Sequence, residues 1–234
     1  MSNHRILIVL TSHDTLGQTG EKTGFWLEEF AAPYYVFRDA GADITLASPL
    51  GGHPPIDPKS ALEEWQTADT QRFALDPVAQ AALAETVRVV DLDAGDFDAI
   101  FFPGGHGPMW DFPDDRALAD LIEAFDEEQK PIGAVCHGPV ALVGATRSDG
   151  RPLVAGKRIS AFTNTEEQAV GLAEVVPFLL QDRIAALGAT FVKSEDFTSH
   201  VVTDGHLVTG QNPQSSAAGA EAVLALLKAR NAAA

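Results

Sequence analysis

The sequence has little basic charge and a single cysteine. Lysine and arginine together number 16 against 33 aspartates and glutamates, which gives a formal net charge of −17. A surface of this sign repels phosphate backbones and acidic membranes. One cysteine excludes an intramolecular disulfide framework, and a free thiol suits a reducing compartment. We therefore expect a cytoplasmic protein with neither nucleic acid nor membrane as a partner.

Long apolar runs, repeats and linkers are also missing from the sequence. No stretch approaches the ~20 consecutive apolar residues of a membrane helix. The apolar run at 6–10 is too short for a signal-peptide core, and polar residues follow it. The hydrophobic content of 45% is enough for a sizeable core. We predict one domain over residues 1–234, with an insertion over about 51–76 that carries Trp65 and could cover a crevice.

Apolar, partly β-branched runs alternate with segments of helical character. The runs that predict buried strands are 6–10, 44–47, 99–102, 132–135 and 159–162. The segments that predict helices are 24–40, 77–86, 116–129, 139–145, 166–187 in two pieces, 215–229, and a short one near 61–67. This order predicts an α/β fold with a mainly parallel sheet and helices on both faces. In such sheets, ligands bind beyond the carboxyl ends of the strands.

The lone cysteine, Cys136, stands at the end of one predicted strand. His137 follows it, and then a Gly-Pro pair that can begin a helix. This pattern predicts a nucleophile elbow, in which a sharp strand-to-helix turn projects the side chain above the sheet. The helix terminus and His137 would favour the reactive thiolate. The alternative is a buried cysteine that acts as a small hydrophobic residue.

A glycine-rich segment, Pro-Gly-Gly-His-Gly at 103–107, follows the predicted strand 99–102. Its glycines would let the backbone approach a ligand closely. One of its N–H groups, together with the amide of His137, could form a two-donor hole for the oxyanion that appears when Cys136 attacks a carbonyl. The alternative is an ordinary glycine-rich turn.

Two pairs of glutamates are candidates for proton transfer and for orienting a histidine. Either Glu28 or Glu29 could point toward the thiol, where burial would raise its pKa and fit it for acid–base work. Periodicity does not choose between them, and a solvated face is the alternative for each. Glu166 or Glu167 could orient the imidazole of His137. Acidic residues after Thr or Asn also cap helices, and two adjacent glutamates can serve both uses.

The other six histidines show no metal-ligand spacing such as His-x-x-x-His. They are His4, His13, His53, His106, His200 and His206. A zinc site is therefore unsupported by the sequence, and we predict no metal and no other cofactor.

Taken together, the motifs resemble the ThiJ/PfpI superfamily of class I glutamine amidotransferase-like proteins. Within it they resemble the branch of chaperone-like, glutathione-independent glyoxalases (glyoxalase III). The resemblance covers nearly the whole chain and rests on Thr23-Gly24 with Glu29 and Pro33, and on the segments 54–58, 104–107, 134–139, 162–167, 203–205 and 209–213. It implies a flavodoxin-like fold with a nucleophile elbow and a small cap-like insertion, and it implies a homodimer.

The resemblance also assigns roles to residues of this chain. It makes Cys136 the nucleophile, His137 the adjacent histidine, and Glu167 the acid that orients the histidine. It selects Glu29 over Glu28 as the carboxylate near the thiol, because the family's glutamate lies four residues before a helix proline.

The oxyanion donors implied by the resemblance are the amides of Gly105 and His137, with Gly104 and His106 as further substrate-binding residues. The implied activity is that of a glyoxalase III-like lyase of the D-lactate dehydratase type. Such an enzyme converts methylglyoxal or a related 2-oxoaldehyde to a 2-hydroxy acid such as lactate through a Cys136 hemithioacetal. A deglycase activity on early oxoaldehyde adducts is a further expectation for the same site.

Other functions share parts of this pattern. Glutamine amidotransferases take their histidine from a downstream His-x-Glu sequence, but neither His200 nor His206 is followed by that pattern. A cysteine peptidase or amidohydrolase would need room that the expected cover over 51–76 would restrict. A stress-related holdase chaperone or redox sensor would use an exposed apolar patch or the oxidation of Cys136.

Overall fold

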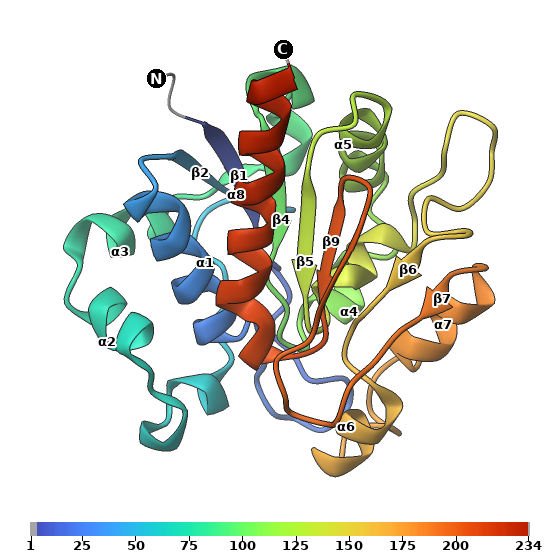
Figure 1. Cartoon of the computed structure of the whole chain (residues 1–234). Coiled ribbons are helices and arrows are strands. Elements are labelled where there is room, and N and C mark those ends of the chain that lie inside the picture. The colour runs from blue at the N-terminus through green and yellow to red at the C-terminus, as the bar shows by residue number, and fades with distance from the viewer. Residues whose placement is uncertain (1–3, 234) are drawn as a thin grey trace.

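A seven-stranded sheet forms the centre of the computed structural model, which describes residues 4–233 (Figure 1). In spatial order its strands are β3 (Val87–Arg88), β2 (Asp43–Ser48), β1 (Arg5–Val9), β4 (Ala99–Phe102), β5 (Ile132–Val135), β9 (Leu207–Gly210) and β8 (Val201–Asp204). Neighbouring strands pair in parallel, except for the antiparallel β8–β9 hairpin. A separate parallel pair joins β6 (Arg158–Ile159) to β7 (Thr190–Phe191).

Helices cover both faces of the sheet. They are α1 (Leu27–Asp39), α2 (Ala68–Ala74), α3 (Pro77–Ala84), α4 (Pro108–Asp111), α5 (Arg116–Glu127), α6 (Asn164–Ala169), α7 (Leu180–Ala186) and α8 (Ser216–Ala233). Figure 1 shows α8 lying across one face beside α1. The described helices include none that is both long and apolar enough to cross a membrane.

The central strands are apolar throughout because each face packs on its own hydrophobic cluster. Alternate side chains of β1, Ile6 and Ile8, pack in the cluster that contains residues of α1 and α8. Leu7 and Val9 face the opposite cluster, which contains residues of α5. Continuous apolar runs are expected when both faces of a parallel sheet are buried. The α/β, mainly parallel, flavodoxin-like fold predicted from the sequence is therefore confirmed.

Several local expectations were wrong. The run 159–162 forms only the short strand β6, outside the central sheet. The segment 139–145 forms no α-helix, since residues after the elbow make the 3₁₀ helix η5 (Gly138–Leu142). Near 61–67 the chain forms the 3₁₀ helices η1 (Pro58–Ala61) and η2 (Glu63–Trp65). The helix α2 follows them, with Thr67 as its N-cap.

The segment 51–76 is fixed against the chain that leads into α1. The Asp57 carboxylate accepts a hydrogen bond from the Thr23 hydroxyl at 2.9 Å, and Ser60 Oγ accepts the Leu27 N–H at 3.0 Å. The rings of Trp65 and Trp26 meet edge to face with centroids 5.4 Å apart. These contacts bring the segment to the edge of the sheet where β4 and β5 end. The single domain predicted over 1–234 includes residues 1–3 and 234, which lie outside the described residues.

Candidate active site

Cys136 occupies a sharp turn directly after β5. Its φ of +59° lies in the left-handed region, which a non-glycine residue rarely adopts. Two backbone hydrogen bonds hold it there: its N–H donates to the Gly210 carbonyl at 3.0 Å, and its carbonyl accepts the Phe162 N–H at 2.9 Å. The chain then turns so closely that a Cβ on Gly138 would lie 2.2 Å from the Phe102 carbonyl oxygen. The nucleophile elbow predicted from the sequence is present.

The glycine-rich segment 103–107 runs beside this elbow, as the parallel topology requires. Gly105 has a φ of +89°, and a Cβ there would lie 2.4 Å from the Trp26 nitrogen. A Cβ on Gly104 would lie 2.6 Å from both the His137 nitrogen and Glu29 Oε2. Only glycine allows this close approach. The Gly105 N–H consequently reaches the Cys136 sulfur as a hydrogen-bond donor.

Of the first glutamate pair, Glu29 is the residue beside the thiol. Its side chain on α1 is fully buried, and Oε2 accepts the Gly104 N–H at 2.7 Å. Oε1 is buried without a hydrogen bond from any described nitrogen or oxygen. Burial raises the pKa of Glu29 to about 8, although hydrogen bonds with the Cys136 thiol and the Gly104 amide oppose the rise. Glu28 instead lies half-buried and accepts a hydrogen bond from Thr67.

The expected acidification of the thiol is wrong for this geometry. Burial raises the pKa of the Cys136 thiol well above its usual value, and the neighbouring Glu29 carboxyl raises it further. The helix terminus that was expected to lower it is only the five-residue 3₁₀ helix η5. Two buried acids in contact cannot both ionise readily, so the thiol and the Glu29 carboxyl are both protonated at neutral pH.

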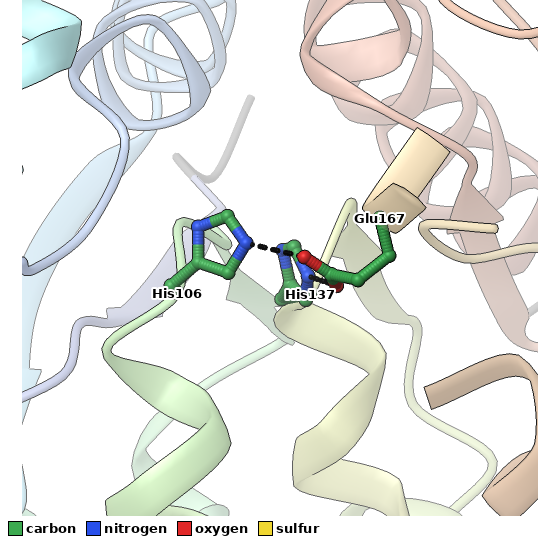
Figure 2. Close-up of side chains that lie close together, drawn as sticks. All are labelled: His106, His137 and Glu167. Atoms are coloured by element: carbon green, nitrogen blue, oxygen red, sulfur yellow. Dashed lines mark hydrogen bonds and ion pairs between the residues drawn. The ribbon is translucent and has the colours of Figure 1, made fainter. Parts of the chain in front are cut away.

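Near the sulfur, the Glu167 carboxylate bridges two histidines (Figure 2). His137 Nδ1 lies 3.4 Å from Cys136 Sγ, and its Nε2 is 2.7 Å from Glu167 Oε2. The second oxygen, Oε1, is 2.8 Å from His106 Nε2. Burial opposes ionisation of Glu167, but the two histidines outweigh it and hold the pKa of this carboxyl well below its usual range. Burial and the His106 ring lower the pKa of His137, so its imidazole is neutral at pH 7.

Glu166, the neighbour of Glu167, has a structural role. Oε2 completes a capping box with Thr163 at the start of α6. Oε1 accepts hydrogen bonds from the Phe197 N–H, the Gln211 amide and the Asn212 amide, all between 2.8 and 3.1 Å. Glu167 thus contacts His137 and Glu166 caps α6, which are the two uses that the sequence allowed for this pair.

We expect Glu166→Gln to destabilise the protein by about 3 kcal/mol, because an amide nitrogen would face buried donors that now share a carboxylate. The free energy of unfolding in urea measures this effect. Glu174→Gln, on an exposed side chain, is the matched control. Equal unfolding midpoints for both variants and the wild type would contradict this account of Glu166.

The raised pKa of Glu29 also predicts a pH-dependent stability. Between its usual value of 4.5 and about 8, the folded state keeps a proton that the unfolded chain releases. The wild type should therefore lose stability relative to Glu29→Gln as pH rises through this interval, by a few kcal/mol in total. Urea unfolding of both proteins at several pH values measures the difference. A constant difference would show that Glu29 ionises normally.

The sulfur lies at the base of a pocket whose outer wall the sequence did not reveal. Glu29, His106, Cys136 and His137 line the base together with Gly105. The remaining lining residues are Trp26, Trp65, Phe162, Val170, Phe197, Pro213 and Gln214. Of these, Trp65 carried a signal as an aromatic residue in the predicted insertion, and Phe162 and Pro213 belong to the motifs 162–167 and 209–213, but none was predicted to line the pocket.

The downstream histidines take no part in this site. His206 Nε2 pairs with the Asp126 carboxylate at 2.7 Å, and neither His200 nor His206 lines the pocket. This placement agrees with the absence of the amidotransferase His-x-Glu pattern.

His106, His137 and Glu167 are also the side chains nearest to a metal-binding arrangement. One potential ligand atom from each lies within 4.8 Å of the others, and histidine and carboxylate are ordinary zinc ligands. Each oxygen of Glu167 is, however, already paired with one ring nitrogen. The three side chains satisfy one another without an ion, and we assign them no metal.

Comparison with known proteins identifies chains that are similar in sequence and fold. Residues 22–226 match the DJ-1/PfpI family. Glyoxalase 3 of Candida albicans is 32% identical over 229 residues, covering 94% of this chain and 97% of the relative. The glutathione-independent glyoxalase HSP31 of Saccharomyces cerevisiae is 29% identical, covering 92% and 94%.

Two solved structures superpose over nearly the whole chain. The crystal structure of glyoxalase III from Candida albicans has a TM-score of 0.89 at 30% identity, and the match covers 96% of this chain and 98% of that one. The Rapid Encystment Protein 24 KDa of Francisella tularensis has a TM-score of 0.92 at 36% identity, with 96% and 99% covered.

Proposed function

The chain belongs to the DJ-1/PfpI family, and on that premise we propose that it is a glutathione-independent glyoxalase acting on methylglyoxal or a related 2-oxoaldehyde. One observation carries the proposal. The Cys136 sulfur lies between the buried Glu29 carboxyl and the imidazole of His137 at the base of a pocket. This arrangement supports a nucleophile served by two proton-transfer groups.

The first step is addition of sulfur to the aldehyde carbon. Because the Glu167 carboxylate accepts from His137 Nε2, the lone pair of the neutral ring is on Nδ1, which faces the sulfur at 3.4 Å. Nδ1 takes the thiol proton as the C–S bond forms and the carbonyl electron pair moves to oxygen. The amides of Gly105 and His137 donate to no backbone oxygen of the described residues, and as the oxyanion forms the Gly105 N–H turns from the sulfur to donate to it together with the His137 N–H. The oxyanion then takes the proton from His137, which gives a neutral hemithioacetal.

The second step moves a proton between the two substrate carbons. Glu29, protonated at neutral pH, gives its proton to the ketone oxygen while His137 removes the C–H proton of the hemithioacetal carbon. An enediol results. His137 returns its proton to the second carbon, and the hydroxyl proton of the first carbon goes back to Glu29. The product is a thioester of lactate, and both groups are in their starting forms.

Water hydrolyses the thioester and regenerates the Cys136 thiol. The balance is one methylglyoxal and one water converted to one lactate, with no redox partner and no glutathione. The same steps on an early adduct of the oxoaldehyde with an amine or a thiol would constitute the deglycase activity.

The proposal is tested by incubating the protein with methylglyoxal in thiol-free buffer and measuring methylglyoxal and lactate together. We expect many equivalents of lactate per protein, one for each methylglyoxal consumed. Loss of at most a few equivalents of methylglyoxal without lactate would mean that the protein is only modified by the aldehyde, and the proposed function would fail.

A sensor or peptidase role finds less support in the site. The thiol is 3% exposed and its pKa is raised, whereas redox-sensing cysteines are accessible and acidic. Its position at the base of a pocket leaves less room for a polypeptide than a surface groove would. The homodimer and the cytoplasmic location stay predictions, and size-exclusion chromatography with light scattering tests the first.

A further inference from the structure

We propose that the outer half of the pocket is an aromatic subsite that selects 2-oxoaldehydes with an apolar, preferably aryl, substituent over glyoxal. Trp26 and Trp65 form one pair of rings in this subsite, and Phe162 and Phe197 form another. The proposal rests on the proposed function and names the substrate class of that same site. Phenylglyoxal, with mandelate as its product, is the simplest substrate of this class.

The rings are arranged around the path to the sulfur. Phe162 lies beside the residues at the base of the pocket, and its ring centroid is 4.5 Å from that of His137. This base, with Cys136, His137, Glu29 and His106, is the catalytic end of the pocket. Phe197 continues this wall outward, with its centroid 6.3 Å from that of Phe162. Trp26 and Trp65 meet edge to face at 5.4 Å. A substrate whose aldehyde carbon reaches Cys136 would therefore place its substituent among aromatic rings, where stacked and edge-to-face contacts are favourable.

Several apolar side chains at the mouth of the pocket are exposed to solvent. Trp65 and Val170 are each 44% exposed, and Phe197 is 40% exposed. All three line the same pocket. Exposed apolar side chains gathered at one concave site are typical of ligand-binding surfaces, whereas isolated ones need no explanation.

The backbone of Phe197 supports a functional reason for its position. Its φ is +55°, a strained conformation for a bulky residue. The buried Glu166 carboxylate fixes this conformation by accepting the Phe197 N–H at 2.8 Å. The structure thus holds an aromatic side chain at the pocket mouth at a conformational cost that glycine would avoid.

Charged substituents have no partner in this subsite. The lining residues include no lysine or arginine, and the ionisable groups Glu29, His106, Cys136 and His137 all belong to the catalytic end. A phosphate or carboxylate on the substrate would lose its hydration without gaining a counter-charge. The subsite therefore favours neutral, apolar substituents.

The test compares kcat and KM for glyoxal, methylglyoxal and phenylglyoxal without glutathione. We expect kcat/KM for phenylglyoxal to exceed that for glyoxal by about tenfold or more, mainly through a lower KM. Trp65→Ala and Phe197→Gly should each reduce this preference by about tenfold. Glycine is the useful replacement at residue 197, because it adopts the positive φ without strain and keeps the N–H to Glu166.

Leu75→Ala is the matched control, because it removes an apolar side chain that is 85% exposed and outside the pocket. This substitution should leave kcat/KM unchanged for all three substrates. Equal kcat/KM values for phenylglyoxal and glyoxal in the wild type would overturn the proposal. A proportional loss for all substrates in both subsite variants would also overturn it.

A binding measurement separates the subsite from the chemistry. Acetophenone carries the aryl ketone without an aldehyde, and its binding can be followed by quenching of tryptophan fluorescence. If no oxoaldehyde is turned over, the proposed function fails, and acetophenone binding that weakens in Phe197→Gly would still support an aromatic subsite. Absence of acetophenone binding to the wild type would refute the subsite itself.

Discussion

Replacement of Cys136 by alanine should abolish lactate formation from methylglyoxal, with a loss in kcat of at least about 1000-fold. No other cysteine exists in the chain to supply a nucleophile. Without the C–S bond, the aldehyde carbon has no covalent attachment through which the enediol can form. The measurement is lactate production in thiol-free buffer at saturating methylglyoxal.

The fold should survive this substitution, so the loss reports chemistry. Alanine keeps the Cβ and the two backbone hydrogen bonds that hold residue 136 at its positive φ. Cys136→Ser tests the same point with a side chain of similar size but a much weaker nucleophile. Lactate formation by Cys136→Ala at a rate near that of the wild type would remove Cys136 from the mechanism.

Glu29→Gln should reduce kcat by about 100-fold to 1000-fold and leave KM nearly unchanged. Glutamine keeps the size of the side chain and can still accept the Gly104 N–H, so the loop with the oxyanion donors stays in place. It cannot give a proton to the ketone oxygen and take it back. The initial rate of lactate formation across pH 6 to 9 measures the loss and its pH dependence.

Glu28→Gln is the neighbouring control. Glu28 lies beside Thr67 and does not line the pocket that contains Cys136, so its neutral variant should retain most of the activity. In the wild type, kcat should fall as pH rises through the Glu29 pKa of about 8, because the ionised carboxyl has no proton to give. A Glu29→Gln enzyme as active as Glu28→Gln would contradict the role of Glu29 as a proton donor.

The sequence was sufficient to locate the elbow because the residues that mark it, an apolar strand, Cys136 and the following His-Gly-Pro, are contiguous. The positive φ of Cys136 itself depends on hydrogen bonds to the distant residues Gly210 and Phe162. The order of strands and helices likewise predicted a parallel sheet that brings the segment 103–107 beside Cys136.

The ionisation of the thiol could not be predicted in the same way. The sequence displays only the chain neighbours of Cys136, and these suggested an acidic thiol. The groups that decide the pKa, Glu29 and the surrounding apolar atoms, reach the sulfur through tertiary packing. The choice of Glu29 over Glu28 required the resemblance, because both glutamates belong to a helix whose neighbouring positions are largely buried.

The outer wall of the pocket was missed because its residues carry no shared signal in the sequence. Val170 and Phe197 come from separate segments, Val170 from a largely apolar one after α6 and Phe197 from a mostly polar one after β7. Strand β9 was also missed, although it pairs with β5 inside the sheet. Only the first two of its four residues, Leu207 and Val208, are apolar, so the run gives no distinct pattern.

Mass spectrometry of the protein quenched during turnover tests the covalent mechanism most directly. The account predicts a species carrying the mass of one methylglyoxal on the peptide that contains Cys136. It should be present in the wild type, accumulate in Glu29→Gln and be absent in Cys136→Ser. Steady lactate production with no adduct on Cys136, in either the wild type or Glu29→Gln, would contradict the covalent role assigned to this cysteine.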